Sequence, residues 1–337
     1  MKNITALKIL VIIVFTFAAI KIYSQETGEQ RTGIKSYGFT ISPQAGFVYG
    51  QALEYVYPAN TKGELLSELR WDMKPVFYLG LQAEFGKKDM MSEAGFFSSL
   101  SFKIGIPGDS GVMEDRDWQS IENSALTNFS SHTNKTRQFF SLDASIGATV
   151  PVKTILLIKP FISGSWMHFG FTGRDGSYKY ARDKSGNPFI NTNTYFPIDD
   201  NPHTGTLKGD VIKYKQDWLL LSPGIAIGLK AFYPFSVFVS FGVSLFTYCS
   251  SRDDHLDPSK QETYLDFTNA GLLYEPSVSI SYSFKRIEHS IEFSYRHIGK
   301  TRGDVYQEDI FGYIYFPNRA GAGLSMTDMR YLLKIHL

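Results

Sequence analysis

Apolar residues alternate with small, polar or charged residues along much of the chain. From Phe77 to Phe85 every second residue is apolar, and Gly80, Gln82 and Glu84 lie between them. Successive side chains of a β-strand point to opposite faces of a sheet. The same alternation recurs in 140–150, 277–283 and 291–296. The pattern therefore predicts strands that have one apolar face and one polar face.

The alternation divides the chain into ten expected strands. Short turns near 87–88, 152–153, 233–234 and 285–286 alternate with connections that are mostly longer and polar. Short periplasmic turns and longer external loops are typical of outer-membrane barrels. The expected fold is all-β, a ten-stranded antiparallel transmembrane β-barrel with long extracellular loops and both termini on the periplasmic side. The expected strands are 36–57, 64–86, 93–115, 137–150, 154–178, 209–231, 236–255, 263–283, 288–304 and 325–337.

A soluble β-sandwich could show similar alternation, but the composition favours the barrel. Aromatic residues make up 15% of the chain, with 20 Tyr and 27 Phe, yet the mean hydropathy is only −0.15. This combination fits an apolar exterior around a polar lumen. The net charge of +1 gives no support for a nucleic-acid partner. A single cysteine, Cys249, excludes a disulfide within the chain, and we interpret it as a small strand residue.

The first 24 residues have the character of a signal peptide. Two lysines precede an apolar run from Ile9 to Ile20, and cleavage is expected near Tyr23-Ser24-Gln25. An uncleaved anchor is the alternative, although the run is shorter than the roughly 20 residues of a spanning helix. We expect residues 25–337 to form one barrel domain.

Acidic residues gather at two strand ends that should meet at the external rim. Asp115 and Asp117 end the third expected strand, and Asp253 and His255 end the seventh. Residues two apart share one face of a strand. A His–Asp pair facing a second carboxylate could take a proton from a water molecule between them, as general-base catalysis requires. Solvated acids at the bases of loops remain the simpler alternative from spacing alone.

These segments resemble the omptin family of outer-membrane proteases. The more specific matches are Asp115-Arg116-Asp117-Trp118 and Asp253-Asp254-His255-Leu256-Asp257-Pro258. Weaker matches occur in the same order and extend over most of the mature chain. They are Glu54-Tyr55-Val56-Tyr57, Ser130-Ser131-His132, Arg174-Asp175-Gly176-Ser177-Tyr178 and Tyr214-Lys215-Gln216.

The resemblance implies an aspartic-type endopeptidase at the cell surface that cuts peptides or proteins near Lys or Arg. Asp253 and His255 would activate a water molecule, and Asp115 would contact the same water from the opposing side. Asp117 would support the site, Ser130 and His132 would lie beside it, and Glu54 would receive a basic side chain. We expect a monomer embedded in outer-membrane lipid, with no cofactor, metal or nucleic acid.

Four positions depart from the family pattern. Two acids of the family's specificity pocket are replaced by Asn128 and Ser251, which predicts relaxed choice on one side of the cut. Positions that bind lipopolysaccharide in the family hold His168 and Asp217, so dependence on that lipid is in doubt. A barrel acting as an adhesin or host-protein receptor is therefore the alternative function. A porin-like channel is disfavoured because ten strands leave a narrow lumen that side chains fill.

One conflict concerns the side of the barrel that the dyad faces. In the seventh expected strand, Val237 to Leu245 set the outward alternation, which would also place Asp253 and His255 outside. A bulge between Cys249 and Asp253 would reverse the faces. Alternatively, the strand has risen above the membrane by that point. The sequence leaves both open.

Overall fold

The computed structural model describes residues 37–58, 65–87, 94–119, 125–153, 155–182, 198, 201–232, 234–256, 262–309 and 312–337. The expected signal peptide, and Asp257 and Pro258 of the second acidic segment, lie outside these residues. The chain forms two units, Met1–Tyr37 and Gly38–Leu337, and the second is a β-barrel. Among the described residues, no helix is long and apolar enough to cross a bilayer.

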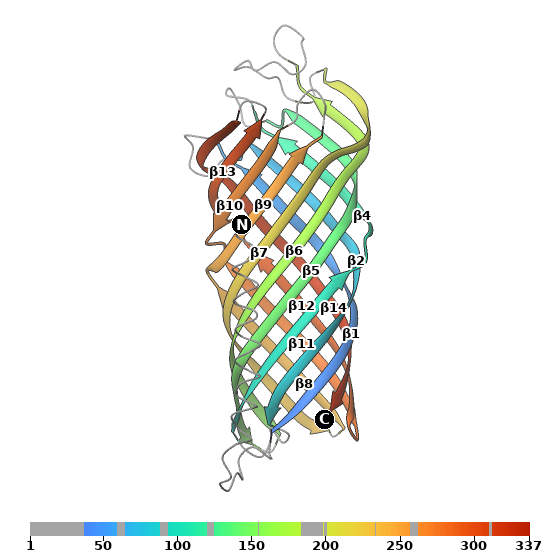
Figure 1. Ribbon diagram of the computed structural model, residues 1–337, viewed down its shortest axis with the longest axis vertical. Helices are drawn as coiled ribbons and strands as arrows, with labels where there is room; N and C mark the ends of the chain where they lie inside the picture. The colour runs from blue at the N-terminus through green and yellow to red at the C-terminus, as the bar shows by residue number, and fades with distance from the viewer. Residues whose placement is uncertain are drawn as a thin grey trace. The chain divides into compact units, whose positions relative to one another are not determined.

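Fourteen antiparallel strand segments make up the sheet within the described residues (Figure 1). The segments are β1 Tyr37–Val56, β2 Ser67–Lys87, β3 Gly95–Gly105, β4 Gly108–Asp117, β5 Asn128–Lys153, β6 Leu156–Tyr180, β7 His203–Phe232, β8 Phe235–Ser244, β9 Phe246–His255, β10 Thr263–Asn269, β11 Leu273–Phe284, β12 Ile287–Ile298, β13 Arg302–Asp309 and β14 Gly312–His336.

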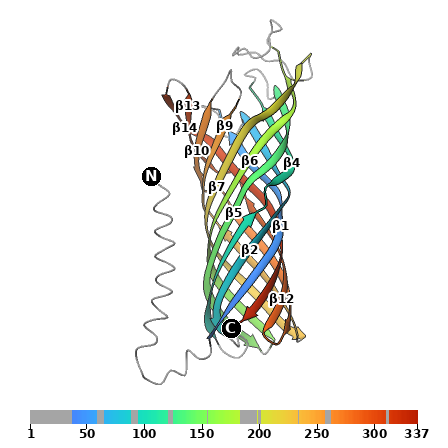
Figure 2. The same cartoon turned by 45° about the vertical axis from the view of Figure 1, so that its right-hand side comes forward.

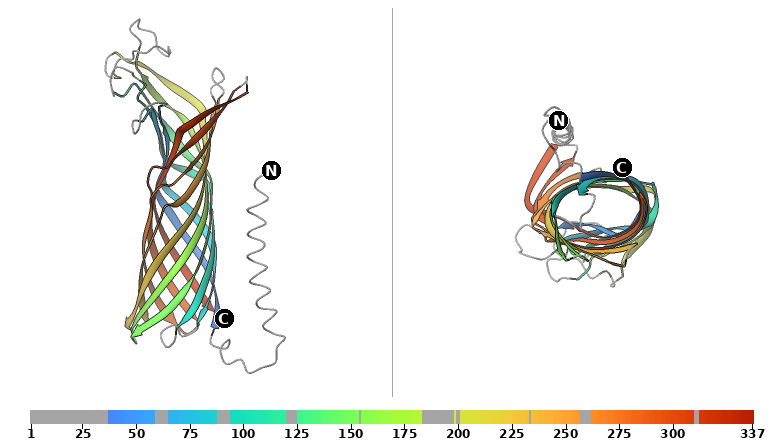
Figure 3. Two further views of the ribbon diagram at one scale, coloured as in Figure 1. Left: turned by 90° about the vertical axis from the view of Figure 1, so that its left-hand side faces the viewer. Right: turned by 90° about the horizontal axis from the view of Figure 1, so that it is seen from below.

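These segments are the ten predicted strands of one closed ring. Four strands are each divided by a short break, into β3 and β4, β8 and β9, β10 and β11, and β12 and β13. β1 pairs with β14 from Thr40↔His336 to Val56↔Ala320, which closes the ring (Figure 3). Closure gives every strand two neighbours, so the sheet exposes no unpaired edge to lipid.

The strands continue beyond the band that would contact lipid. A spanning strand needs about 9–11 residues, whereas β5 has 26 residues and β7 has 30. The predicted loop at 305–324 is wrong, because β13 and β14 pair there, and β5 begins at Asn128 rather than at 137. Above the membrane both faces meet water, so apolar alternation no longer marks a strand. Figure 2 shows these extensions at the end of the barrel opposite the C-terminus.

The outer face of the barrel carries an apolar band. Large apolar side chains project outward from neighbouring strands, and their polar neighbours in sequence face the lumen. This is the expected surface of a strand that meets hydrocarbon outside and polar groups inside. Members of the band include Phe77, Leu79, Leu81, Phe102, Ile104, Ile146, Ile225, Ile227, Val239, Phe241, Ile291 and Phe293.

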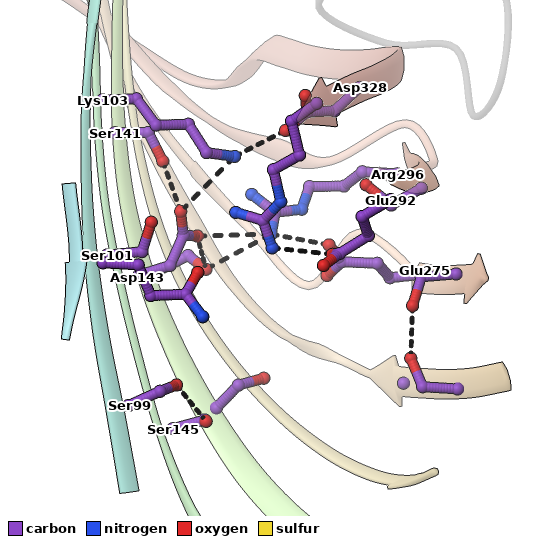
Figure 4. Close-up of a pocket in the computed structure, with 18 of the residues that line it drawn as sticks. Ser99, Ser101, Lys103, Ser141, Asp143, Ser145, Glu275, Glu292, Arg296 and Asp328 are labelled. Atoms are coloured by element: carbon purple, nitrogen blue, oxygen red, sulfur yellow. Dashed lines mark hydrogen bonds and ion pairs between the residues drawn. The ribbon is translucent and has the colours of Figure 1, made fainter. Parts of the chain in front are cut away.

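The lumen inside this band holds a cavity of about 210 Å³ that is lined by ion pairs and serines (Figure 4). Lys103 Nζ lies 2.5 Å from Asp328 Oδ2, and Arg296 Nη2 lies 2.8 Å from Glu275 Oε1 and 3.4 Å from Asp143 Oδ1. Buried charges are tolerated when they are paired in this way. These pairs join β3 to β14 and β5 to β12 across the lumen.

Six rings in mutual contact, here called the aromatic floor, lie above this network, and all but Tyr78 are stacked. Trp71 stacks on Tyr214 with ring centroids 5.3 Å apart, and Phe139 stacks on Phe169 at 5.2 Å. On β2 and β6 these rings lie between the pocket residues and the external rim, and Phe139 on β5 borders the pocket itself. The floor consists of Trp71, Tyr78, Phe139, Phe169, Phe171 and Tyr214.

Two glycines make room for the aromatic floor. A Cβ atom at Gly46 would lie 2.8 Å from the Tyr78 hydroxyl, and one at Gly105 would lie 2.6 Å from Phe139 Cβ. Both separations are too short for real contacts, so larger residues would displace the rings. Close packing across the narrow lumen thus depends on small residues on the facing strands.

We predict that Phe169→Ala lowers the free energy of unfolding by about 3–5 kcal/mol, because truncating a buried ring leaves a cavity. Guanidinium titration of the barrel in detergent measures this change. The lipid-facing Phe293→Leu is the matched control and should change stability by less than about 1 kcal/mol. Equal losses in the two variants would show that the floor carries no special packing.

Candidate active site

A bulge in the seventh barrel strand turns the predicted dyad inward. Leu245 and Phe246 are consecutive, and both point outward, with 62% and 72% of their surfaces exposed. Gly242 pairs with Gly224 and Phe246 with Leu221, so three residues face two across this gap. The bulge lies before Cys249 and not between Cys249 and Asp253, which was one of the two alternatives that the sequence left open. Beyond it the odd-numbered residues face the lumen.

One wall of the site is formed by β4 and its neighbours β2 and β5. Asp115 pairs in register with Leu69 on β2 and with Ser130 on β5. Ser67 Oγ donates a hydrogen bond to Asp115 Oδ1 at 3.3 Å, and Asn128 Nδ2 donates to Asp117 Oδ2 at 3.4 Å. Asn128 is one of the four departures from the family pattern. Its side chain donates a hydrogen bond to Asp117 and adds no negative charge.

The opposite wall is the end of β9. Its register against β7 pairs Asp253 with Tyr214 and His255 with Ile212. His255 Nε2 lies 3.1 Å from Asp253 Oδ2, and Tyr264 on β10 stands edge-on to the imidazole with ring centroids 5.6 Å apart. Asp253 is 3% exposed. A buried carboxylate at this distance fixes the orientation and tautomer of the ring.

Charged groups on the two walls interact electrostatically across the lumen. Burial raises the pKa of Asp115 well above its usual value, and the charges of Asp117 and Asp253 raise it further. The His255 imidazolium and the Ser67 hydrogen bond oppose that shift. The structure thus brings Asp115, Asp117, Asp253 and His255 together, as the spacing predicted.

Ser130 and His132 lie on the first wall, beside Asp115. His132 Nε2 lies 2.9 Å from Ser130 Oγ, and Nδ1 lies 2.5 Å from the Asp175 carbonyl oxygen. The carbonyl can only accept, so Nδ1 carries the proton and Ser130 donates to Nε2. Burial lowers the pKa of His132. The neutral imidazole therefore positions the serine hydroxyl.

Glu54 from β1 lies among other carboxylates, and one of them was missed in the sequence. Burial raises the pKa of Glu54 well above its usual value, with further contributions from Asp253, Asp266 and Asp115. Asp266 on β10 pairs in register with Ser251 and accepts a 3.1 Å hydrogen bond from its hydroxyl. Its segment, Tyr264-Leu265-Asp266-Phe267, carries alternation that only indicates a strand. Nothing in that spacing links Asp266 to Glu54.

Of the remaining predicted positions, His168 and Asp217 lie away from this cluster. His168 Nδ1 lies 2.9 Å from Asp217 Oδ1 on the barrel exterior, where Trp166 Nε1 also donates to the same oxygen at 3.3 Å. Cys249 is buried in the lumen. Among the residues described, no group of His, Cys, Asp and Glu side chains has the arrangement of a metal site.

Glu54→Gln should stabilise the barrel at pH 8 more than at pH 5. A carboxyl whose pKa is raised on folding favours the folded state while protonated and disfavours it once ionised. The amide removes that ionisation, and the gain should be roughly 1–3 kcal/mol, the cost of an unpartnered buried polar group. Guanidinium unfolding at both pH values measures it, with Glu308→Gln on β13 as control. A gain that grows on acidification would contradict the assigned direction.

Comparisons with known proteins identify the architecture. The family model described as Omptin family matches residues 35–329. The crystal structure of the outer membrane protease OmpT from Escherichia coli superimposes with a TM-score of 0.77 at 20% identity, covering 93% of this chain and 99% of that one. At this identity the likeness establishes the fold alone. No curated protein matches the sequence significantly.

Other membrane barrels match far less well. The transport unit of the autotransporter AIDA-I from Escherichia coli has a TM-score of 0.33 at 10% identity, covering 94% of this chain and 97% of that one. The Pseudomonas putida toluene transporter TodX has a TM-score of 0.31 at 9% identity, covering 89% of each chain. These two likenesses carry no argument about the site.

Proposed function

This chain belongs to the Omptin family, and from that premise we propose that it is an endopeptidase of the outer membrane. The single observation that carries the proposal is the His255–Asp253 pair, 3.1 Å apart, inside the lumen and electrostatically coupled to Asp115 on the facing wall. An adhesin or receptor would have no need for an imidazole held between buried acids. The geometry therefore favours hydrolysis over the alternative function.

The proposed reaction uses an activated water molecule. Asp253 orients the imidazole of His255 through one ring nitrogen, so the ring accepts a proton on the other. Asp115, supported by Asp117, holds the water from the opposite wall. The hydroxide equivalent attacks the peptide carbonyl carbon, and the proton taken by His255 is returned to the leaving amine. This is general-base catalysis without a protein nucleophile, and Ser130 is a positioning residue.

The aromatic floor supports this chemistry by keeping bulk water out from below. Trp71, Tyr214 and Phe171 are buried beneath the site and form one continuous stack. Charges interact more strongly where water is excluded. A single water between Asp115 and His255 would therefore be polarised by fixed groups. The site would open only toward the outside of the cell.

The proposed substrates are peptides or proteins that carry Lys or Arg near the cut. The acidic character of the site supports this preference. The negative charges of neighbouring carboxylates raise the pKa values of both Asp115 and Glu54. A cation in the cleft would relieve that repulsion. We further propose that the barrel works as a monomer in outer-membrane lipid. Asp217 on the exterior is held by His168 and Trp166, which gives no reason to require lipid phosphate for activity.

Replacing either wall's carboxylate should abolish cleavage. We expect Asp115→Ala and Asp253→Ala each to reduce kcat/KM on a Lys- or Arg-containing peptide by at least about 10²-fold, the usual contribution of a proton-transfer group. Mass spectrometry of the products measures the rate. Asp210→Ala, which removes an exposed acid paired with Arg174, is the matched control. Full activity in both site variants, with folded barrels, would exclude the proposed mechanism.

Ser67→Ala should move the acid limb of the pH–rate profile to higher pH. The Ser67 hydrogen bond favours the ionised form of Asp115 and lowers its pKa. A bond of about 1 kcal/mol corresponds to a displacement of roughly 0.7 pH unit. The dependence of kcat/KM on pH measures the shift. Ser99→Ala, which removes a lumenal serine below the floor, should leave the profile unchanged, and a shift to lower pH in Ser67→Ala would refute the role of Asp115.

A further inference from the structure

We propose that one backbone peptide at the external rim, between Asp175 and Gly176, sets the direction of a hydrogen-bond chain that ends beside Asp115. Asp175 is then a positioning residue, because it holds this peptide in the orientation that keeps the Ser130 hydroxyl from donating to Asp115. We call the chain from Asp175 through His132 to Ser130 the rim relay. The inference rests on the proposed function where it concerns catalysis, whereas the direction of the relay can be measured without any reaction.

The peptide lies in an irregular part of the sheet. The register between β6 and β7 shifts on both sides of Arg174, and the register between β5 and β6 shifts at His132. Asp175 and Gly176 have positive φ values of 50° and 119°. Aspartate is one of the few residues other than glycine that tolerate this region. A Cβ atom at Gly176 would lie 2.1 Å from the Ser131 carbonyl oxygen and 2.9 Å from His132 Nδ1, so a larger residue would displace the imidazole.

The Asp175 carbonyl oxygen decides the direction of the rim relay. His132 Nδ1 donates to this oxygen at 2.5 Å, and Ser130 Oγ donates to His132 Nε2 at 2.9 Å. A neutral imidazole has one donor and one acceptor nitrogen, so a partner that can only accept places the proton on Nδ1. The hydroxyl proton of Ser130 is therefore committed to His132. Only the lone pairs of the serine oxygen remain for other groups of the site.

A half-turn of the same peptide would reverse every bond of the relay. It would replace the Asp175 carbonyl with the N–H of Gly176, which can only donate, so His132 Nδ1 would become the acceptor. His132 Nε2 would then donate to Ser130, and the serine hydroxyl would be free to donate to Asp115. Ser130 and Asp115 are directly paired across β5 and β4. Directly paired residues share one face, with Cβ atoms about 4.5–5.5 Å apart.

The side chain of Asp175 holds the peptide against this rotation. Its Oδ1 accepts a 2.9 Å hydrogen bond from the backbone N–H of Gly209 on the neighbouring strand β7. Gly209 also has a positive φ, of 82°, and lies at the irregularity of β7 that faces Asp175. The bond ties the left-handed residue to β7 and keeps its carbonyl directed at His132. Asparagine offers the same acceptor and the same tolerance of positive φ, whereas glycine offers only the tolerance.

The direction of the relay affects the charge of Asp115. A hydroxyl that donates to this carboxylate favours its ionised form and lowers its pKa, as the Ser67 hydrogen bond does. In the observed direction Ser130 adds no second bond of this kind, so the carboxylate remains free to hold the water. The charged groups that act on Asp115 are Asp117 on its own strand, Asp253 and His255 on β9, and Glu54 on β1.

Two substitutions at one position test the rim relay. Asp175→Gly tolerates the backbone conformation but loses the bond to Gly209, so the peptide can rotate. The acid limb of kcat/KM should then move to lower pH by up to about 0.7 unit, because Ser130 donates to Asp115. On the plateau kcat should fall by about 5-fold, the weight of one hydrogen bond, with KM unchanged. Asp175→Asn restores the acceptor and should recover the wild-type profile.

Nitrogen NMR of the barrel in detergent, with isotope-labelled histidine, reads the tautomer with no substrate present. The His132 signal is identified by its loss in His132→Gln. We expect the proton on Nδ1 in wild type and in Asp175→Asn, and a proton at least partly moved to Nε2 in Asp175→Gly. Asp304→Gly is the matched control, since it removes a carboxylate that likewise accepts a backbone N–H, that of Asn318, at 2.9 Å. The control should change neither the tautomer nor the pH profile.

The outcomes separate this inference from the proposed function. An Nε2 proton in wild type, or an unmoved tautomer or pH profile in Asp175→Gly, would overturn the rim relay and leave the endopeptidase standing. A pH shift of equal size when Asp175→Gly is combined with Ser130→Ala would also overturn the relay, because the serine would then play no part. A tautomer that responds to Asp175→Gly, in a barrel whose wild type cuts no peptide, would support the relay and contradict the endopeptidase.

Discussion

The narrow lumen of a closed ten-stranded sheet is the constraint on which the rest of this molecule depends. Every strand sends alternate side chains into one interior, and none can avoid its neighbours. Below, the interior is lined by paired charges such as Lys103–Asp328. Above them the aromatic floor closes the barrel with stacked rings. The site exists because polar side chains above this floor are confined to one small space that opens at the rim.

Confinement also sets the chemistry of the site. Carboxylates on β1, β4, β9 and β10 would separate in an open structure, but the closed sheet holds them within electrostatic reach. Burial and mutual repulsion then raise the pKa values of Glu54 and Asp115. Burying these acids close together costs free energy. A cation or a polarised water molecule that enters the site would offset that cost. Catalysis and substrate choice would therefore share one electrostatic cause.

The comparison with OmpT shows how far the sequence can change while this fold persists. The two chains are 20% identical, yet they superimpose over nearly their full lengths. A barrel tolerates such change because lipid-facing positions require only apolar character. Lumenal positions are more restricted, because their side chains share one narrow interior. Ser251 and Asp266, for example, are paired across β9 and β10 and joined by a hydrogen bond.

The sequence alone determined the strand number, the closed ring and the two acidic segments, because alternation directly records which side chains face lipid. It failed where lipid contact ends, as at the paired region of β13 and β14 and the start of β5. It left open how the dyad turns inward, because only strand pairing shows that Leu245 and Phe246 both face outward at a bulge. The tertiary structure alone decided that Asp266 joins Glu54, since pairing between distant strands leaves no mark on local spacing.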